Sequence, residues 1–256
     1  MSKWGNGHAR NFGWDLDPDD RWFDARHGDA AYVIDGKGIL TASGNGPRMY
    51  VNDPEKNVEW DENQEITVYY QRESETKEVS YSGPQIFTHT NHGTLLVDGV
   101  TKEEKAPADT RGYGVKMNIN GSFAFEKEIK HGVSYATNAL VRPWDRFPIG
   151  QWVGIKYVIR SLENKSKVKL QVYRDLTEGV NGGKWELISE FIDDGTNFGG
   201  GMEPCYPGVD PAMVLLRSKT LAQSESKKPE IAVYFRHEYG AMKYSKASIR
   251  EIDPLP

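Results

Sequence analysis

Two short stretches of the sequence carry side chains that could do acid–base chemistry on a sugar. Gln85 and His89 are spaced four residues apart, and the run YFRHEY has Tyr234 and Tyr239 at its ends with Arg236 between them. If the strands that carry them are neighbours, a His, a Tyr and an Arg could converge on one groove. Such a set suits β-elimination at a uronic acid: a cation or amide neutralises the carboxylate, a His or Tyr removes the C5 proton, and a Tyr protonates the leaving oxygen. Surface or capping histidines are the plainer alternative.

Other polar and aromatic side chains recur at alternate positions of the predicted strands. Alternate residues of a strand point to the same face of a sheet, so side chains with this spacing could line one surface. Amide, cationic and aromatic groups are the kinds that bind sugars and carboxylates. The candidate substrate-binding residues are Lys116, Asn118, Tyr157, Gln171, Tyr173 and Tyr234. An ordinary solvated sheet face remains the alternative, since Lys and Gln are common on such faces.

A turn rich in oxygen atoms is a candidate for a structural calcium ion. The segment 175–185, DLTEGVNGGKW, could hold the ion through Asp175, Asn181 and backbone carbonyls. It lacks the acidic spacing of an EF-hand, so a plain Gly-rich turn is the alternative. The elimination chemistry itself requires no metal or other cofactor. A second acidic cluster is expected to be solvated, and it consists of Asp15, Asp17, Asp19 and Asp20.

A pair of carboxylates raises hydrolysis as a further possibility. Glu126 and Glu128 lie two residues apart and would share a strand face, as an acid and its partner in a glycoside hydrolase must face one another. The alternation of Glu and Lys in FEKEIKH is also well explained by cross-strand ion pairs. We therefore rank hydrolysis below elimination. Cys205 is the only cysteine, which excludes an intrachain disulfide and a four-cysteine zinc site.

The elements that must position these side chains are predicted to be strands. The 13 Tyr, 7 Trp and 9 Phe, with 26 Gly and 13 Pro, suit short strands joined by many turns. The stretch 150–175 alternates apolar and polar residues on both sides of a charged turn at 162–167, which predicts a β-hairpin. A second hairpin is predicted around Asn120-Gly121. About a dozen short strands without an internal repeat indicate a single sandwich or jelly-roll domain over residues 1–256, of which residues 1–25 form an extended N-terminal lead-in.

Charge and hydropathy exclude some partners and locations. The formal net charge of −5 argues against a general nucleic-acid binder. No apolar run is long enough to cross a bilayer. Residues 1–20 lack the apolar core of a signal peptide, so the protein is either intracellular or begins after a removed signal.

The order of the motifs resembles that of the jelly-roll polysaccharide lyases, such as family 7 alginate lyases and glucuronan lyases. That family has an Arg-bearing strand, then a Gln-Ile-His strand, and near the C-terminus a Tyr-Phe-Lys strand followed by a Tyr. The same order is formed here by Arg72, Gln85-Ile86 with His89, and Tyr234-Phe235-Arg236 with Tyr239. His89 follows Gln85 by four residues instead of two, Arg236 replaces Lys, and the full Arg-x-Glu-Leu-Arg pattern is lacking. The C-terminal part, from GQWVGIKYVIRS through SIREIDP, is also similar to uncharacterised archaeal secreted proteins of the concanavalin-like class.

The resemblance implies an all-β, concanavalin-like jelly-roll sandwich of two antiparallel sheets. It also implies a polysaccharide lyase that cleaves a uronate-containing anionic polysaccharide by β-elimination on the concave sheet face. In that role His89 is the base, Tyr239 the base or acid partner, and the carboxylate is neutralised by Gln85, Arg72 and Arg236. The expected partner is an anionic polysaccharide, and the expected state is a secreted monomer.

The alternative is a non-catalytic carbohydrate-binding module or lectin-like domain that uses the same face. It would bind sugars with aromatic side chains, including Trp144 and Tyr157. A lyase needs a His or Tyr within proton-transfer reach of C5, whereas a binding module needs only stacking and hydrogen bonds.

Overall fold

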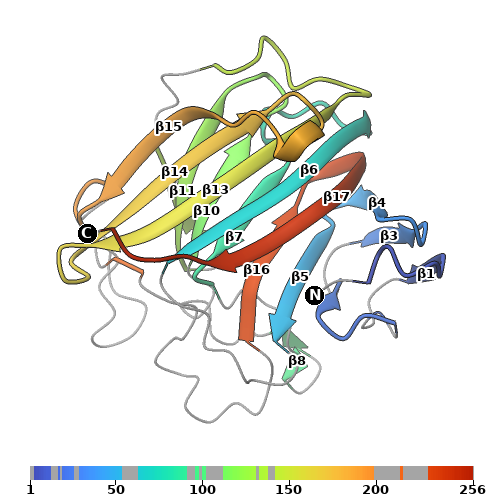
Figure 1. The fold of residues 1–256 in the computed structure, drawn as a ribbon, viewed down its shortest axis with the longest axis horizontal. Coiled ribbons are helices and arrows are strands. Elements are labelled where there is room, and N and C mark those ends of the chain that lie inside the picture. The colour runs from blue at the N-terminus through green and yellow to red at the C-terminus, as the bar shows by residue number, and fades with distance from the viewer. Residues whose placement is uncertain are drawn as a thin grey trace.

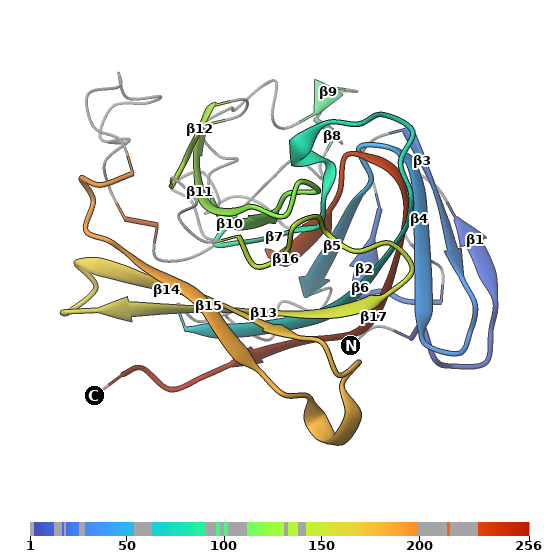
Figure 2. The same cartoon turned by 90° about the horizontal axis from the view of Figure 1, so that it is seen from above.

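The computed structural model describes residues 3–12, 17, 19–25, 29–53, 63–90, 96–97, 100–101, 112–130, 133–137, 142–198, 214–215 and 230–255. Within these residues two large antiparallel sheets lie in two layers (Figures 1 and 2). A separate small ladder pairs β8 (Leu96–Val97) with β9 (Val100–Thr101). Two 3₁₀ turns are formed by η1 (Ser80–Ser82) and η3 (Val180–Gly182). Cys205 lies outside the described residues.

The larger sheet, called sheet A, has eight strands in the described part of the chain. In spatial order they are β1 (Arg10–Phe12), β3 (Asp29–Ile34), β4 (Ile39–Asn45), β17 (Tyr239–Glu251), β6 (Gln64–Ser74), β13 (Trp152–Leu162), β14 (Lys167–Asp175) and β15 (Glu186–Asp193). The predicted hairpin over 150–175 is confirmed, since β13 and β14 pair from Gly154↔Asp175 to Leu162↔Lys167.

The second sheet, called sheet B, has seven strands in the described residues. In spatial order they are β12 (Val133–Ala136), β11 (Phe123–Lys130), β10 (Gly112–Met117), β7 (Gln85–Thr88), β16 (Glu230–Arg236), β5 (Arg48–Asp53) and β2 (Phe23–Asp24). The hairpin predicted around Asn120-Gly121 joins β10 to β11. Gly121 has a φ of +84°, and a Cβ there would lie 1.9 Å from the carbonyl oxygen of Trp144, so this turn requires glycine.

The last two strands of the chain insert between earlier ones. β16 lies between β7 and β5 in sheet B, and β17 lies between β4 and β6 in sheet A. Strands β4 to β7 alternate between the two sheets. This arrangement is that of a concanavalin-like jelly-roll sandwich, so the predicted fold class is confirmed. The helical turns found among the described residues are too short and too polar to cross a membrane.

The core lies between the sheets and follows the period-two pattern of the strands. From sheet A it receives Ile155, Tyr157 and Leu170, and from sheet B it receives Val115 and Phe235, all at most 1% exposed. Each of these residues alternates with one that points out of the sandwich. Tyr157 therefore belongs to the core, with 0% exposure. The expectation that Tyr157 lines a sugar-binding surface is wrong.

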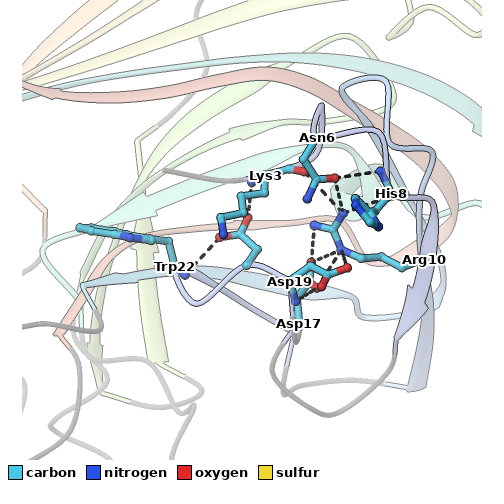
Figure 3. Close-up of polar contacts among 8 residues, drawn as sticks. Lys3, Asn6, His8, Arg10, Asp17, Asp19 and Trp22 are labelled. Carbon is cyan, nitrogen blue, oxygen red and sulfur yellow. Dashed lines mark hydrogen bonds and ion pairs between the residues drawn. The ribbon is translucent and has the colours of Figure 1, made fainter.

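The N-terminal residues, which include β1 of sheet A, are joined to each other by buried acids (Figure 3). Arg10 in β1 binds both carboxylate oxygens of Asp17 at 2.8 Å, and Asp20 accepts hydrogen bonds from the backbone of Lys3 and Trp22. Asp17 and Asp20 are 1% and 0% exposed. The expectation of a solvated acidic cluster is therefore wrong for these two residues, because backbone and guanidinium donors replace water. Asp15 lies outside the described residues.

Candidate functional site

The outer face of sheet B, which points away from sheet A, carries two parallel cross-strand rows of side chains. Their strand neighbours Ile86, Phe235 and Met49 point into the core, so the residues between them must point outward. The first row, called the polar row, runs across β10, β7, β16 and β5 and consists of Lys116, Gln85, Arg236 and Arg48. The second, called the aromatic row, crosses the same strands and consists of Gly114, Phe87, Tyr234 and Tyr50.

The aromatic row is fully buried although it lies outside the main core. Phe87 stacks on Tyr234 with ring centroids 4.8 Å apart, and Tyr50 lies 5.5 Å from Tyr234. All three residues are 0% exposed. A Cβ on Gly114 would lie 2.5 Å from the Phe87 ring, so glycine at 114 makes room for this stack. The row forms a second, smaller apolar cluster on the outer side of sheet B.

The phenol of Tyr234 is held in its protonated form. Burial raises its pKa far above the usual range, and this outweighs the opposing charges of Arg236 and Arg48. The carboxylates of Glu126 and Glu128 raise it further. A phenol in this state stays protonated at neutral pH and cannot act as a base, and its raised pKa also makes it a weaker acid than an exposed phenol.

The polar row is only partly exposed and is tied to carboxylates at its ends. Arg48 Nη2 lies 3.2 and 3.4 Å from the two carboxylate oxygens of Glu238, and Arg236 also pairs with Glu238. At the other end Lys116 Nζ lies 2.5 Å from Glu126 Oε2. The side chains of Lys116 and Arg236 are 23% and 16% exposed, so the row is reachable from solvent at these positions.

Gln85 occupies the middle of the polar row in a fixed orientation. Its Nε2 donates to the carbonyl oxygen of Tyr81 at 3.0 Å. A carbonyl can only accept, so this contact determines which end of the amide is nitrogen. Gln85 is 1% exposed, whereas the neighbouring Tyr81 is 46% exposed.

Several buried polar atoms of the row have no hydrogen-bond partner among the described residues. They include the acceptor Oε1 of Gln85 and the donor Nε atoms of Arg236 and Arg48. Buried polar atoms are nearly always hydrogen-bonded in folded proteins, so each exception calls for an explanation such as a bound water or ligand. Here two donors and an acceptor lie on three adjacent strands.

His89 does not share the face of Gln85, contrary to the sequence-based expectation. It follows the last residue of β7 and has a φ of +53°, which breaks the two-residue alternation of the strand. Its ring lies 6.1 Å from that of the core residue Tyr113, and its Nδ1 lies 2.7 Å from the carbonyl oxygen of Leu215. The residue that shares the face of Gln85 two positions later is Phe87, which has no titratable group.

Arg72 and Tyr239 also lie away from the two rows. Arg72 belongs to β6 of sheet A, is 2% exposed and pairs with Glu75, which in turn binds Arg146. Burial lowers the pKa of Arg72, although Glu75 opposes this. Tyr239 begins β17 of sheet A, where the ammonium of Lys77 lies 5.2 Å from its ring centroid. Of the five predicted catalytic residues, the structure brings Gln85 and Arg236 together on one face.

The predicted substrate-binding residues are divided among several regions. Lys116 and Tyr234 belong to the rows described above. Gln171 and Tyr173 lie on β14, where they point to the outer face of sheet A. Asn118 lies in the β10–β11 turn and donates to Ser122 Oγ at 2.9 Å. Trp144 lies in the segment before β13 and packs against Phe147.

The predicted calcium ligand Asp175 is surrounded by donors. Its carboxylate accepts hydrogen bonds from Tyr69 Oη, from Thr177 and from the backbone of Gly179 and Lys184, at 2.6 to 3.0 Å. Burial alone would raise the pKa of Asp175, but these hydrogen bonds lower it well below the usual range. A cation at this carboxylate would have to displace them. Among the described residues no group of three His, Cys, Asp or Glu side chains is placed to hold a metal, and the calcium expectation stays a prediction.

Glu126 and Glu128 share the outer face of sheet B, as their spacing predicts. Lys127 between them points inward and pairs with Asp193 at 2.7 Å, with both side chains at most 1% exposed. The cross-strand ion pair expected for this segment is formed by Glu126 with Lys116. Glu and Lys therefore alternate in this strand because the Glu side chains lie on the outer face of sheet B and Lys127 lies on its inner face.

Sequence reasoning placed Glu238 on the same strand face as Tyr234 and Arg236, but it missed three residues of this face: Arg48, Tyr50 and Phe87. A signal for the first two exists in the sequence. Arg48-Met-Tyr50 has the spacing of Tyr234-Phe-Arg236 in reverse order, as expected for antiparallel neighbours that place like residues opposite one another. The structure indeed pairs Arg48 with Arg236 and Tyr50 with Tyr234.

No family model matches the chain, and no curated protein does either. Three solved structures illustrate its structural similarities. A Shewanella oneidensis MR-1 protein of unknown function is 8% identical over 97% of this chain and 89% of that chain, with a TM-score of 0.44. Peanut lectin is 10% identical over 96% and 99%, with a TM-score of 0.44. The PL-14 alginate lyase from Aplysia kurodai is 10% identical over 95% and 90%, with a TM-score of 0.39. These similarities carry no argument about what this chain binds or catalyses.

Proposed function

We propose that this protein binds a carbohydrate chain along the polar row on the outer face of sheet B. The observation that carries the proposal is the set of buried polar atoms without partners in that row: Gln85 Oε1, Arg236 Nε and Arg48 Nε. A sugar hydroxyl both donates and accepts a hydrogen bond. A ligand with several hydroxyls can therefore satisfy both the acceptor on β7 and the two donors on β16 and β5.

The dimensions and composition of the row also support a saccharide. Four neighbouring strands at roughly 4.8 Å spacing give a row about 14 Å long, which exceeds the width of one sugar ring. Tyr81, whose carbonyl oxygen orients Gln85, exposes 46% of its surface next to the row. An exposed phenol ring offers a flat apolar surface with a polar tip, which suits a sugar ring. The row would thus combine hydrogen bonding with stacking.

The proposal is tested by measuring binding to a panel of neutral and acidic polysaccharides, for example by affinity electrophoresis. The variant Gln85→Leu should weaken binding by about tenfold or more, because a buried hydrogen bond to the ligand is lost. Gln171→Leu, on the outer face of sheet A, is the matched control and should bind like the wild type. Absence of binding to every saccharide, or equal losses in both variants, would contradict the proposal.

A second candidate function is β-elimination of a uronate-containing polysaccharide. One observation favours it: Gln85, Tyr234 and Arg236 share one face, with Gln85 directly opposite Arg236. Tyr234 is protonated but 0% exposed, so it could protonate the leaving oxygen only if the aromatic row opened to the substrate. The base would have to be another group, since His89 points towards the core. Elimination is therefore the second choice.

The two functions are separated by one assay. Alginate and glucuronan are incubated with the protein, and the ultraviolet absorbance of the unsaturated product is followed. A rise that is lost in Tyr234→Phe would support elimination. Retained binding without a rise in absorbance would support a binding module.

A further inference from the structure

We propose that Glu238 sets the charge preference of the polar row, so that the site selects neutral saccharides over acidic ones. This inference rests on the proposed carbohydrate-binding function. Its basis is that the two guanidinium groups of the row already share one carboxylate, that of Glu238. An acidic ligand would have to compete with this internal carboxylate.

Glu238 lies where a ligand carboxylate would otherwise be expected to bind. Both of its oxygens lie within 3.4 Å of Arg48 Nη2, and Arg236 Nη2 binds the same group. The three side chains are between 9% and 16% exposed, so these contacts are largely shielded from water. Charge-assisted contacts of guanidinium with carboxylate are among the stronger hydrogen bonds in proteins. Glu238 therefore competes strongly for the two cations.

The backbone holds Glu238 in this place from two sides. Its carbonyl oxygen accepts a hydrogen bond from Gly46 N at 2.6 Å, and its N–H donates to the carbonyl oxygen of Ser82 at 3.4 Å. Arg48 Nη1 also donates to the carbonyl oxygens of Pro47 and His237. The turn that carries Glu238 is thus connected to the β4–β5 turn and to η1. Movement of the carboxylate out of the site would leave both guanidinium groups without their partner.

The charges of the face agree with a preference for neutral ligands. The charged side chains that the structure describes on this face are three cations and three carboxylates: Lys116, Arg236, Arg48, Glu126, Glu128 and Glu238. The charges of these six described side chains balance to zero. An added carboxylate would create an excess of negative charge in a partly buried site, which is unfavourable. Hydroxyl groups meet no such penalty.

The test uses two probes that differ only in the carboxylate, the β-1,4-linked hexamers of glucose and of glucuronic acid. The variant Glu238→Gln should raise the affinity for the glucuronate hexamer relative to the glucose hexamer by about tenfold or more, since two guanidiniums lose their internal anion. Glu190→Gln on the outer face of sheet A removes the same charge and should leave the ratio unchanged. A ratio within about threefold of the wild type in Glu238→Gln would overturn the inference.

A second measurement keeps the inference separate from the proposed function. Acetate, compared with chloride at equal ionic strength, should raise the melting temperature of Glu238→Gln but not that of the wild type or Glu190→Gln. If neither hexamer binds the wild type or any variant, the proposed binding of these two saccharides is contradicted. The shift in melting temperature with acetate still tests the role of Glu238. Absence of an acetate effect in Glu238→Gln would overturn the inference on its own. Glu238→Ala serves in both measurements if the Gln variant does not fold.

Discussion

The outer faces of sheets A and B differ in how their polar groups are satisfied. On sheet A the polar side chains pair with each other: Glu190 binds Lys169 at 3.0 Å and Gln171 at 3.2 Å, and Lys156 lies 3.8 Å from Glu65. Most of these groups are partly exposed to water. On sheet B the aromatic row is fully buried, and the polar row contains buried donors and acceptors without partners among the described residues.

The difference teaches that alternation of polar and apolar residues does not identify a functional face. Both faces arise from the same period-two pattern, and both contain Lys, Gln and Tyr. What distinguishes sheet B is that three such buried atoms, Gln85 Oε1, Arg236 Nε and Arg48 Nε, lie in one row, whereas Arg160 Nε on the outer face of sheet A belongs to no such row among the described residues. Burial without a hydrogen-bond partner lowers stability unless something else satisfies the atoms. Residues kept in such a condition are candidates for ligand binding.

The largest expected loss of stability follows from a substitution in the aromatic row. Phe87→Ala should reduce the free energy of unfolding by about 4 kcal/mol, because a fully buried ring stacked on Tyr234 is replaced by a cavity. Leu187→Ala on β15 of sheet A, 45% exposed, should lose less than about 1 kcal/mol. Urea denaturation measures both. Similar losses would remove the distinction between the two faces.

The next effect is a loss of stability in acid that originates beside sheet B. His237 is 0% exposed, its Nδ1 lies 2.5 Å from Tyr244 Oη, and burial lowers its pKa to about 4. In the unfolded chain a His titrates near pH 6.5, so between about pH 6.5 and 4 the unfolded state binds more protons. Stability should therefore fall as the pH drops through this window, by up to about 3 kcal/mol.

Denaturation curves at several pH values check this prediction. His237→Gln cannot titrate, so its free energy of unfolding should vary less between pH 7 and 4 than that of the wild type. His8→Gln, at an exposed position near the N-terminus, is the control and should keep the slope of the wild type. A wild-type slope in His237→Gln would show that other groups cause the acid loss.

The sequence predicted the fold well because the alternation of the strands and the turn residues both act locally. It also predicted that Gln85, Lys116, Tyr234 and Arg236 face one way. Alternation says whether a side chain points into or out of a sandwich, but it does not say which sheet the strand joins. For that reason Gln171 could not be assigned to the opposite face of the molecule from sequence alone.

The position of His89 was unpredictable for a different reason. Four residues after Gln85 it should share the same face, provided that the strand stays regular. A left-handed backbone at a non-glycine residue ended that regularity. Its only local cue is that His tolerates this conformation better than most residues do, which is too weak to change a prediction. Contacts with Tyr113 and Leu215, distant in sequence, accompany the turn towards the core.

A smaller change in the free energy of unfolding is expected when Gln85, in the middle of the polar row, is substituted. Gln85→Leu removes a buried acceptor that has no partner among the described residues, and it also loses the hydrogen bond to the carbonyl oxygen of Tyr81. These changes oppose one another, so the free energy of unfolding should stay within about 1 kcal/mol of the wild type. Thermal unfolding without ligand measures this. A loss of about 3 kcal/mol or more would mean that Gln85 is needed for the fold, and its effect on binding would then say little about the site.

The smallest effect is expected on the outer face of sheet A. Lys169 and Glu190 form a cross-strand ion pair at 3.0 Å, but the Glu190 side chain is 48% exposed. Water and salt screen such a pair, so a double-mutant cycle with Lys169→Ala and Glu190→Ala should give a coupling energy of about 0.5 kcal/mol or less. The same variants should bind saccharides like the wild type. A larger coupling would show that the pair is shielded from water, and a loss of saccharide binding would place functional side chains on sheet A and would reverse the assignment of the two faces.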